Sequence, residues 1–271
     1  MATLSFLWHL HQPGYRTADG VSHAPWAALH AGGAYTTLAR AIERAGGRGQ
    51  VLNIVPVLLE QLLAYAAGNV VDPVLDAILT PASDLDAGQR HTLVEWSAHV
   101  NPRQLARYPR LGELARTRPA PRSARRPDRR FSLGALRDLQ VLLVLAHAGE
   151  QAWTDERLAP LHRRGTNFSS GDHAQLAAWL RAQPGELVAR WRRAALLPGV
   201  EVSTSPWAHP IMPLLIDSSV VTASWAPHPA PAVPPFKRPA DACWQLASGL
   251  EYMREQGFAP PLAARLGLHV C

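Results

Sequence analysis

Ser5-Phe-Leu-Trp-His-Leu-His-Gln-Pro-Gly-Tyr-Arg16 is the stretch that decides the fold. From Thr3 to Leu10 the chain is apolar and rich in strand formers, so we predict a β-strand there. Pro13-Gly14 ends this strand, because proline donates no hydrogen bond to a neighbouring strand and glycine weakens a strand interior. The predicted strand therefore finishes where a group of polar side chains appears.

His9, His11 and Gln12 are these polar residues. Side chains at i and i+2 of a strand share one face, so we expect the two imidazoles to point the same way. In open α/β sheets and α/β barrels, ligands bind at the carboxyl ends of the strands. Two imidazoles and an amide at such an end are placed to contact a polar ligand. The alternative is that one or both histidines only form hydrogen bonds inside a loop.

The elements that follow predict an α/β fold with a parallel sheet. Residues 33–45 carry apolar side chains at a 3–4 spacing, which indicates an amphipathic helix. Residues 50–55 form a short apolar strand closed by Pro56, and residues 57–67 are predicted as the next helix. This strand–helix–strand–helix order is typical of parallel strands joined by helical crossovers.

The rest of the chain is predicted as helices joined by loops, with one further strand. The predicted helices cover residues 72–79, 86–98, 133–147, 171–195 and 240–256, and Pro184-Gly185 is expected to break the fourth in two. The predicted loops cover residues 14–31, 101–130 and 227–239. Within them, the Pro/Arg-rich segment 100–130 is predicted as a loop, or as an insertion packed by its own few apolar residues.

Residues 199–203 predict the third strand, which makes half of the sheet that a barrel needs. Glu201 and Ser203 share one face of this strand. Trp207 and His209 follow just beyond its end, on the same expected binding edge. Glu201 is a candidate ligand contact, and its structural alternative is to pair with an arginine or to cap a helix.

Trp26 lies in the predicted loop after the first strand, which would form part of a barrel's active face. Pyranose rings lie against aromatic faces, so Trp26 is a candidate platform for a sugar. The alternative is that its ring only anchors the loop.

Composition favours a folded protein that binds neither nucleic acid nor membrane. At 271 residues and 47% hydrophobic content, the chain is long enough for one α/β domain and is not disordered throughout. The net charge of +6 comes from arginines bunched between Arg116 and Arg130, without the stacking aromatics of a nucleic-acid surface. No apolar run approaches the roughly 18 residues that span a bilayer. Without a signal peptide or a spaced cysteine framework, we predict a cytoplasmic protein.

Several motifs together resemble glycoside hydrolase family 57, the α-amylase and 4-α-glucanotransferase group. The first is His11-Gln-Pro13 after an apolar strand. The others follow in the family's order and spacing: His23-Ala-Pro-Trp26, Leu29-His30, Leu52-Asn-Ile-Val-Pro-Val-Leu-Leu-Glu-Gln61, Asp138-Leu-Gln140, Gly165-Thr-Asn-Phe168 and Gly199-Val-Glu-Val-Ser-Thr-Ser-Pro-Trp-Ala-His-Pro-Ile211. The resemblance covers most of residues 3–257.

The resemblance implies a single domain over residues 1–271, the N-terminal part of an incomplete (β/α)7-type barrel. It implies an α-glucan or oligosaccharide as the partner, and hydrolysis or transfer with retention as the activity of the lineage. His11 and Glu201 match positions that contact the sugar ring in the cleaved subsite, and Trp207 and His209 are further candidates. Neither a cofactor nor a metal is expected.

The family's catalytic carboxylates are not found in the sequence. In the family, the nucleophilic glutamate follows a Trp-Pro-type motif after the helix that matches residues 240–256, and the acid/base aspartate comes later. Here no tryptophan follows Trp244 and no carboxylate follows Glu255. A retaining glycosidase needs two carboxyl groups roughly 5 Å apart. We therefore expect a chain truncated before the nucleophile motif, without appreciable α-glucan hydrolysis, whose uncovered sheet edge favours self-association.

Two other interpretations stay open. One is a non-catalytic remnant that binds carbohydrate. The other is a metal-dependent amidohydrolase, because His9-Leu-His11 resembles the His-x-His motif that binds a catalytic divalent metal in those enzymes. That chemistry requires further histidines and an aspartate on later strands.

Overall fold

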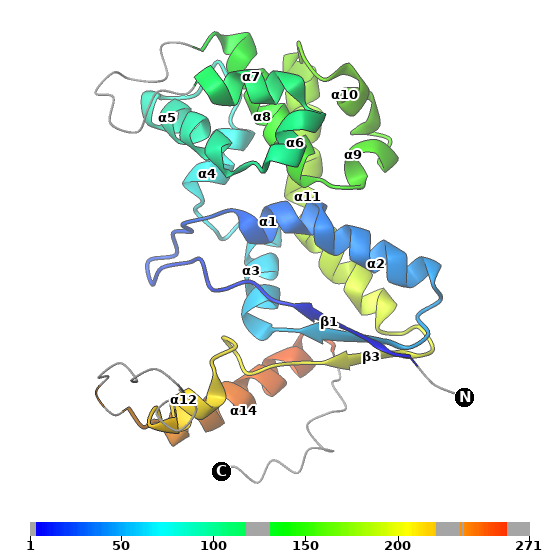
Figure 1. Ribbon diagram of the computed structural model, residues 1–271, viewed down its shortest axis with the longest axis vertical. Helices are drawn as coiled ribbons and strands as arrows, with labels where there is room; N and C mark the ends of the chain where they lie inside the picture. Colours follow the sequence, from blue (N-terminus) through cyan, green and yellow to red (C-terminus); the bar gives the residue numbers. More distant parts are fainter. Residues whose placement is uncertain (1–3, 118–130, 221–233, 235, 259–271) are drawn as a thin grey trace, which may run out of the picture. The chain divides into compact units, whose positions relative to one another are not determined.

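The structure, a computed structural model, describes residues 4–117, 131–220, 234 and 236–258. Within these ranges the chain is a mixed α/β protein with a three-stranded parallel sheet and many helices (Figure 1). The α/β class and the parallel sheet are therefore as the sequence predicts.

The sheet consists of β1 (Phe6–Leu10), β2 (Gln50–Ile54) and β3 (Val200–Ser203), which lie in that order. Both neighbouring pairs are parallel, so all three carboxyl ends meet at one edge. His9 lies opposite Asn53, which lies opposite Ser203. The three predicted strands are confirmed.

The two faces of the sheet differ in polarity because successive side chains point to opposite faces. One face is apolar and carries the buried side chains of Leu10, Leu52, Ile54 and Val202. The other face carries the row His9, Asn53 and Ser203, with Glu201 one row nearer the amino ends of the strands. Polar side chains are therefore collected on one face, close to the carboxyl edge.

The chain divides into two compact units. The first consists of residues 1–14, 42–61 and 190–271 and contains the sheet, whereas the second consists of residues 15–41 and 62–189. This division does not test the prediction of a single barrel domain over residues 1–271, which stays a prediction.

Among the described residues, the helices of the first unit are α12 (Met212–Ile216) and α14 (Pro239–Glu255). Those of the second unit are α1 (Trp26–Gly32), α4 (Pro73–Leu79), α5 (Ala87–Trp96), the 3₁₀ helix η1 (Ser97–His99), α6 (Pro102–Arg107), α7 (Pro109–Thr117), α8 (Leu133–His147), α9 (Gln151–Thr154) and α10 (Ala159–Arg164). The division between the units falls within α2 (Ala34–Arg44), α3 (Pro56–Ala66) and α11 (Ser170–Ala194).

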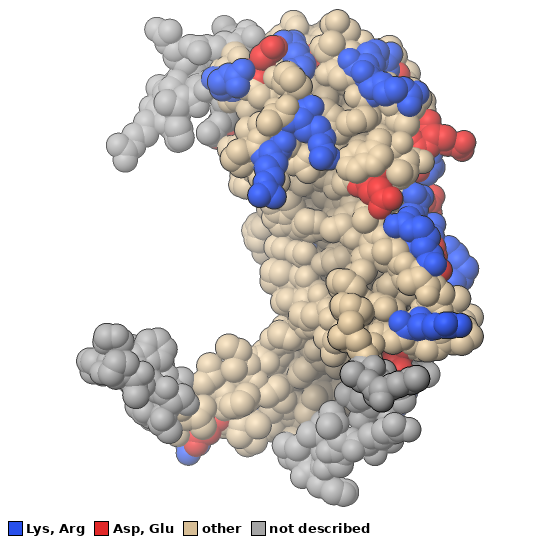
Figure 2. All heavy atoms as spheres, turned by 45° about the vertical axis from the view of Figure 1, so that its right-hand side comes forward, with Lys and Arg blue, Asp and Glu red and all other residues tan. Residues whose placement is uncertain are grey.

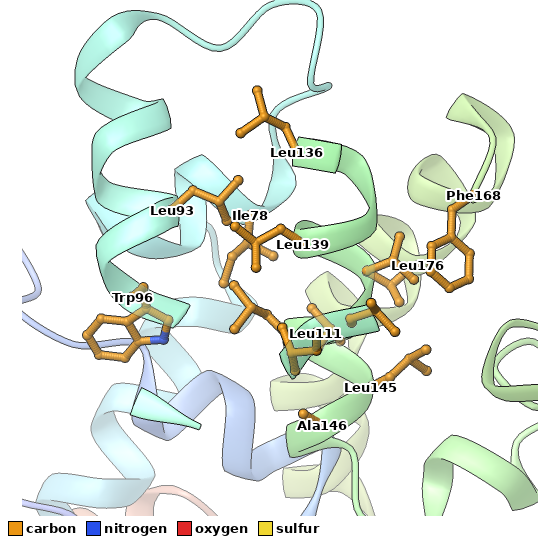
Figure 3. Close-up of a cluster of buried hydrophobic side chains, with 14 of the residues drawn as sticks. Ile78, Leu93, Trp96, Leu111, Leu136, Leu139, Leu145, Ala146, Phe168 and Leu176 are labelled. Carbon is orange, nitrogen blue, oxygen red and sulfur yellow. The ribbon is translucent and has the colours of Figure 1, made fainter. Parts of the chain in front are cut away.

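A hydrophobic core holds the second unit together. In Figure 3, Leu139 of α8 points toward Ile78 of α4 and Leu93 of α5, and all three side chains are fully buried. Burial of each such side chain contributes about 1.5–3 kcal/mol. The core explains why α8 is apolar around most of its circumference.

Helix starts follow the capping residues that the sequence offers. The Asp72 carboxylate accepts hydrogen bonds from the N–H groups of Val74 and Leu75, and Pro73 opens α4. Ser132 caps α8 by accepting from the N–H of Ala135 at 3.2 Å. The predicted helices beginning at these positions are confirmed.

Two predicted loops contain helices. The loop predicted over residues 14–31 ends in α1, because Ala27, Ala28 and Leu29 are buried and bring this turn into the packed interior. In the segment 100–130, residues 102–107 and 109–117 form α6 and α7. The loop alternative is therefore wrong for these residues, and residues 118–130 lie outside the described part of the chain.

The predicted break at Pro184-Gly185 is also wrong, because α11 is one continuous helix of 25 residues that contains Pro184. A proline inside a helix costs about 3 kcal/mol through the hydrogen bond that it removes. Leu180 before the proline and Leu187 and Val188 after it are all buried. Packing on both sides thus outweighs the local cost. The loop predicted over residues 227–239 falls mostly outside the described residues.

Two observations concern the membrane and the charged side chains of the described residues. Among the described residues, no helix combines the length and the apolarity that a membrane crossing demands. On the face shown in Figure 2, lysine and arginine side chains are separated by acidic and uncharged ones.

Candidate functional site

Three histidines converge at the carboxyl edge of the sheet. The ring of His209 lies 4.6 Å from that of His9 and 4.8 Å from that of His11, centroid to centroid, and the rings of His9 and His11 are 5.7 Å apart. One nitrogen from each ring lies within 4.8 Å of the others. The structure thus brings His9 and His11 together, as the strand spacing predicts, and adds His209 from beyond β3.

The loop that carries His209 is held by hydrogen bonds to α14 and by a turn of its own. The N–H of Trp207 donates to the carbonyl of Gln245 in α14 at 2.9 Å, and the N–H of Ala208 donates to the Gln245 side chain at 2.8 Å. A turn closes with the N–H of His209 donating to the carbonyl of Pro206 at 2.9 Å. His209 has φ 56°, a left-handed conformation that is uncommon for residues other than glycine. These backbone hydrogen bonds therefore fix the position from which the His209 side chain extends.

Helix α14 approaches this loop closely at Gly249. A Cβ added there would come within 3.2 Å of the N of Trp207 and 3.3 Å of the carbonyl oxygen of Ser205. Glycine is the residue that permits this approach.

Asn53 connects the strands beneath His9. Its side-chain oxygen lies 2.7 Å from Nδ1 of His9 and accepts a hydrogen bond from the hydroxyl of Ser205 at 3.0 Å. Its Nδ2 donates to the hydroxyl of Ser203 at 2.9 Å. Because Oδ1 of Asn53 accepts only, Nδ1 of His9 is the donor, and in the neutral ring Nε2 is the nitrogen that carries the lone pair. The amide thus orients the His9 ring and leaves its other nitrogen able to accept or coordinate.

The electrostatics of the cluster favour the neutral form of His11. Burial lowers the pKa of His11 below its ordinary value, and the imidazoles of His209 and His9 lower it further, because positive charges in this space repel. His9 and His209 are exposed, and His11 is half-buried. A neutral imidazole can accept a hydrogen bond from a hydroxyl group or bind a metal ion.

Glu201 lies on the same face of the sheet as His9, but not in the same row. It pairs with Val51 on β2, which pairs with Leu7 on β1, so it stands two strands away from β1 and nearer the amino ends. With strands about 4.8 Å apart and about 3.3 Å per residue, its Cα is roughly 16 Å from that of His11. Glu201 is exposed to solvent and is not part of the hydrophobic core.

Gln12 and Trp207 flank the cluster in the chain, and both are half-buried. The Trp207 ring packs edge-on against Tyr252 at 5.0 Å and lies 6.2 Å from Trp244, both on α14. Trp207 therefore packs its loop against α14. The sugar contacts predicted for Trp207 and for Gln12 stay predictions.

Trp26 belongs to the second unit. Its ring lies 5.2 Å from Trp96, 5.5 Å from His147 and 5.7 Å from His30, and it packs on the core of that unit. Burial lowers the pKa of both His30 and His147, which also line a cavity of about 570 Å³. This packing supports the anchoring alternative for Trp26, and its sugar-stacking role stays a prediction.

Two residues were not among the predicted contacts. Asn53 could have been noticed, because asparagine is depleted in strands and here interrupts an apolar one. Trp244 is 56% exposed beside Trp207, but its position within a predicted helix gave no sign of that.

Comparisons with known proteins add no relative: no family model, no curated protein and no solved structure matches this chain.

Proposed function

We propose that the chain binds carbohydrate of the α-glucan type at the carboxyl edge of its sheet and descends from a glycoside hydrolase family 57-like enzyme. The observation that carries the proposal is the meeting of His11 with His209. These residues come from the first and last motifs on which the resemblance rests, far apart in the sequence, and their rings lie 4.8 Å apart. Motifs that form one sugar subsite would have to meet in this way.

The proposed fold is an incomplete (β/α)7-type barrel of which β1, β2 and β3 are the first strands. Support comes from the parallel order of the strands and from the polar face that carries His9, Asn53 and Ser203. In a closed barrel, this face would line the interior. Leu7 on the same face is 63% exposed, which is costly for a large apolar side chain unless something covers it. We propose that a further chain or a second copy covers it.

In this proposal, His11, His9 and His209 accept hydrogen bonds from sugar hydroxyl groups. Glu201 contacts the ligand from the β3 side, and Gln12 and Trp207 border the same edge. Ionised carboxylates and neutral imidazoles are both strong acceptors for hydroxyl donors.

We further propose that sugar is bound without appreciable cleavage. Glu201 is the only acidic residue on the three strands. One carboxylate without a placed partner loses the general acid/base contribution, which is worth roughly 10²–10⁴ in rate.

Calorimetric titration with maltoheptaose in the presence of a metal chelator tests the proposal. We expect saturable binding that is absent with cellohexaose, and at least tenfold weaker binding for His11→Ala, about 1.4 kcal/mol. The matched control is His91→Ala, which removes an exposed imidazole on α5 and should leave the affinity unchanged. Absence of binding to either sugar would refute carbohydrate recognition. Release of shorter glucans above the buffer rate would refute only the loss of catalysis.

A further inference from the structure

We propose that His9, His11 and His209 form a binding site for one divalent metal ion of the zinc class, with one coordination position left open to an oxygen ligand. This site goes beyond the proposed carbohydrate binding and does not depend on it.

The donor set is the first argument. Neutral imidazole is the commonest protein ligand for zinc and also suits copper, nickel and iron. Three protein ligands with a fourth position open to water is the arrangement of catalytic rather than structural zinc sites, and three histidines are one of its known forms. Across the described residues, these three histidines are the group whose nitrogens converge closely enough to hold a metal ion.

The distances are the second argument. Nitrogens bound to one tetrahedral zinc ion at 2.0–2.1 Å lie about 3.4 Å from one another. The three imidazole nitrogens already lie within 4.8 Å of one another. Closing the difference takes at most about 1.4 Å for each pair, and the exposed rings of His9 and His209 can turn about their side-chain bonds.

Preorganisation is the third argument. His9 is fixed to one face of the sheet by β1, and His11 follows one residue beyond the end of that strand. The loop of His209 is fixed by a turn and by α14. The left-handed backbone of His209 is a conformation that a protein retains where the surrounding structure determines it, and such residues concentrate at ligand sites.

The hydrogen bond behind His9 is the fourth argument. Metal-bound histidines nearly always donate their other ring N–H to an oxygen, which fixes the ring and its tautomer. Nδ1 of His9 and Oδ1 of Asn53, 2.7 Å apart, form such a pair, and Asn53 is itself held by Ser203 and Ser205. The bond occupies Nδ1 of His9, so Nε2 is the nitrogen that would bind the metal ion.

The open position would face solvent, because His9 and His209 are exposed. Three neutral ligands leave the full charge of the ion uncompensated, so the position suits water, hydroxide or the oxygens of a polyhydroxyl ligand.

Titration of the purified, metal-free chain with zinc chloride, competed against a chromophoric chelator, tests the site. We expect one zinc ion per chain with a dissociation constant in the micromolar range or below. Cobalt(II) in place of zinc should give the intense visible absorption of a four-coordinate ion. His9→Ala and His11→Ala should each weaken zinc binding at least tenfold and reduce that absorption.

His209→Asn is the sharpest variant, because asparagine tolerates the left-handed backbone and removes only the imidazole. It should weaken zinc binding at least tenfold while circular dichroism stays unchanged. His91→Ala, on the surface of α5, is the matched control and should bind zinc like the parent. The proposal is overturned if folded His209→Asn binds one zinc ion as tightly as the parent, or if His91→Ala weakens binding equally. Failure here leaves the sugar titration in chelator unaffected, so the two proposals fail separately.

Discussion

Replacing Asn53 with alanine tests the polar network on which the candidate site rests. The side chain is 8% exposed and links His9, Ser203 and Ser205. Ser203 is buried at 3% exposure, so its hydroxyl would lose a partner that water cannot replace, at a cost of about 1–3 kcal/mol. His9 and Ser205 reach solvent, so each of those lost bonds costs about 0.5 kcal/mol. The free energy of unfolding should therefore fall by about 2–4 kcal/mol.

Urea unfolding followed by circular dichroism measures this loss. The matched control is Asn69→Ala, the same substitution at an exposed position, which should change the free energy of unfolding by no more than about 0.5 kcal/mol. If Asn53→Ala and Asn69→Ala unfold at the same urea concentration, the network contributes nothing, and the orientation assigned to His9 is wrong.

Three further predictions concern the second unit, and each is measured as the free energy of unfolding in urea. Asp138→Ala should cost about 2–4 kcal/mol, because this buried carboxylate accepts hydrogen bonds from an arginine, a threonine and a buried backbone N–H; a loss below 1 kcal/mol would contradict this. Burial lowers the pKa of His173, so the unfolded chain binds more protons than the folded chain, and the free energy of unfolding falls as the pH drops below about 6.5. His173→Gln should reduce the pH dependence of that free energy by up to about 1.4 kcal/mol per pH unit. An unchanged pH dependence would show that His173 does not cause it. Gly33→Ala should destabilise by about 1–3 kcal/mol, because a Cβ would lie 2.1 Å from the carbonyl oxygen of His147. Gly134→Ala, where the nearest atom to an added Cβ is the Ser132 hydroxyl oxygen at 3.9 Å, should be nearly neutral, and equal effects of the two substitutions would disprove the clash.

The sheet and half of the candidate site could be predicted because they depend on short-range rules. Pro13-Gly14 marks the end of a strand wherever it occurs, and the two-residue period places His9 and His11 on one face before any tertiary contact is known. The capping residues Asp72 and Ser132 act within one helical turn, so their helices could also be predicted.

The convergence of His209 could not be predicted in the same way. It depends on the strand order and on a left-handed residue in a loop that Gln245 holds through the N–H groups of Trp207 and Ala208, and neither leaves a local signal in the sequence. Two other predictions failed for a similar reason: the expected break of α11 at Pro184 and the expected loop where α7 forms. In both, burial of leucines that are distant in sequence overrides a local preference.

Gly249 gives the candidate site a remote point of adjustment. The backbone of Gly249 lies so close to Ser205 and Trp207 that an added side chain would displace their loop. The His209 imidazole, which belongs to the same loop, would move with it. A substitution of Gly249, which contributes no functional group to the site, would therefore change the distances among the three imidazole rings without replacing any of them. In a library of variants selected for altered ligand preference, position 249 would be recovered alongside the residues that touch the ligand.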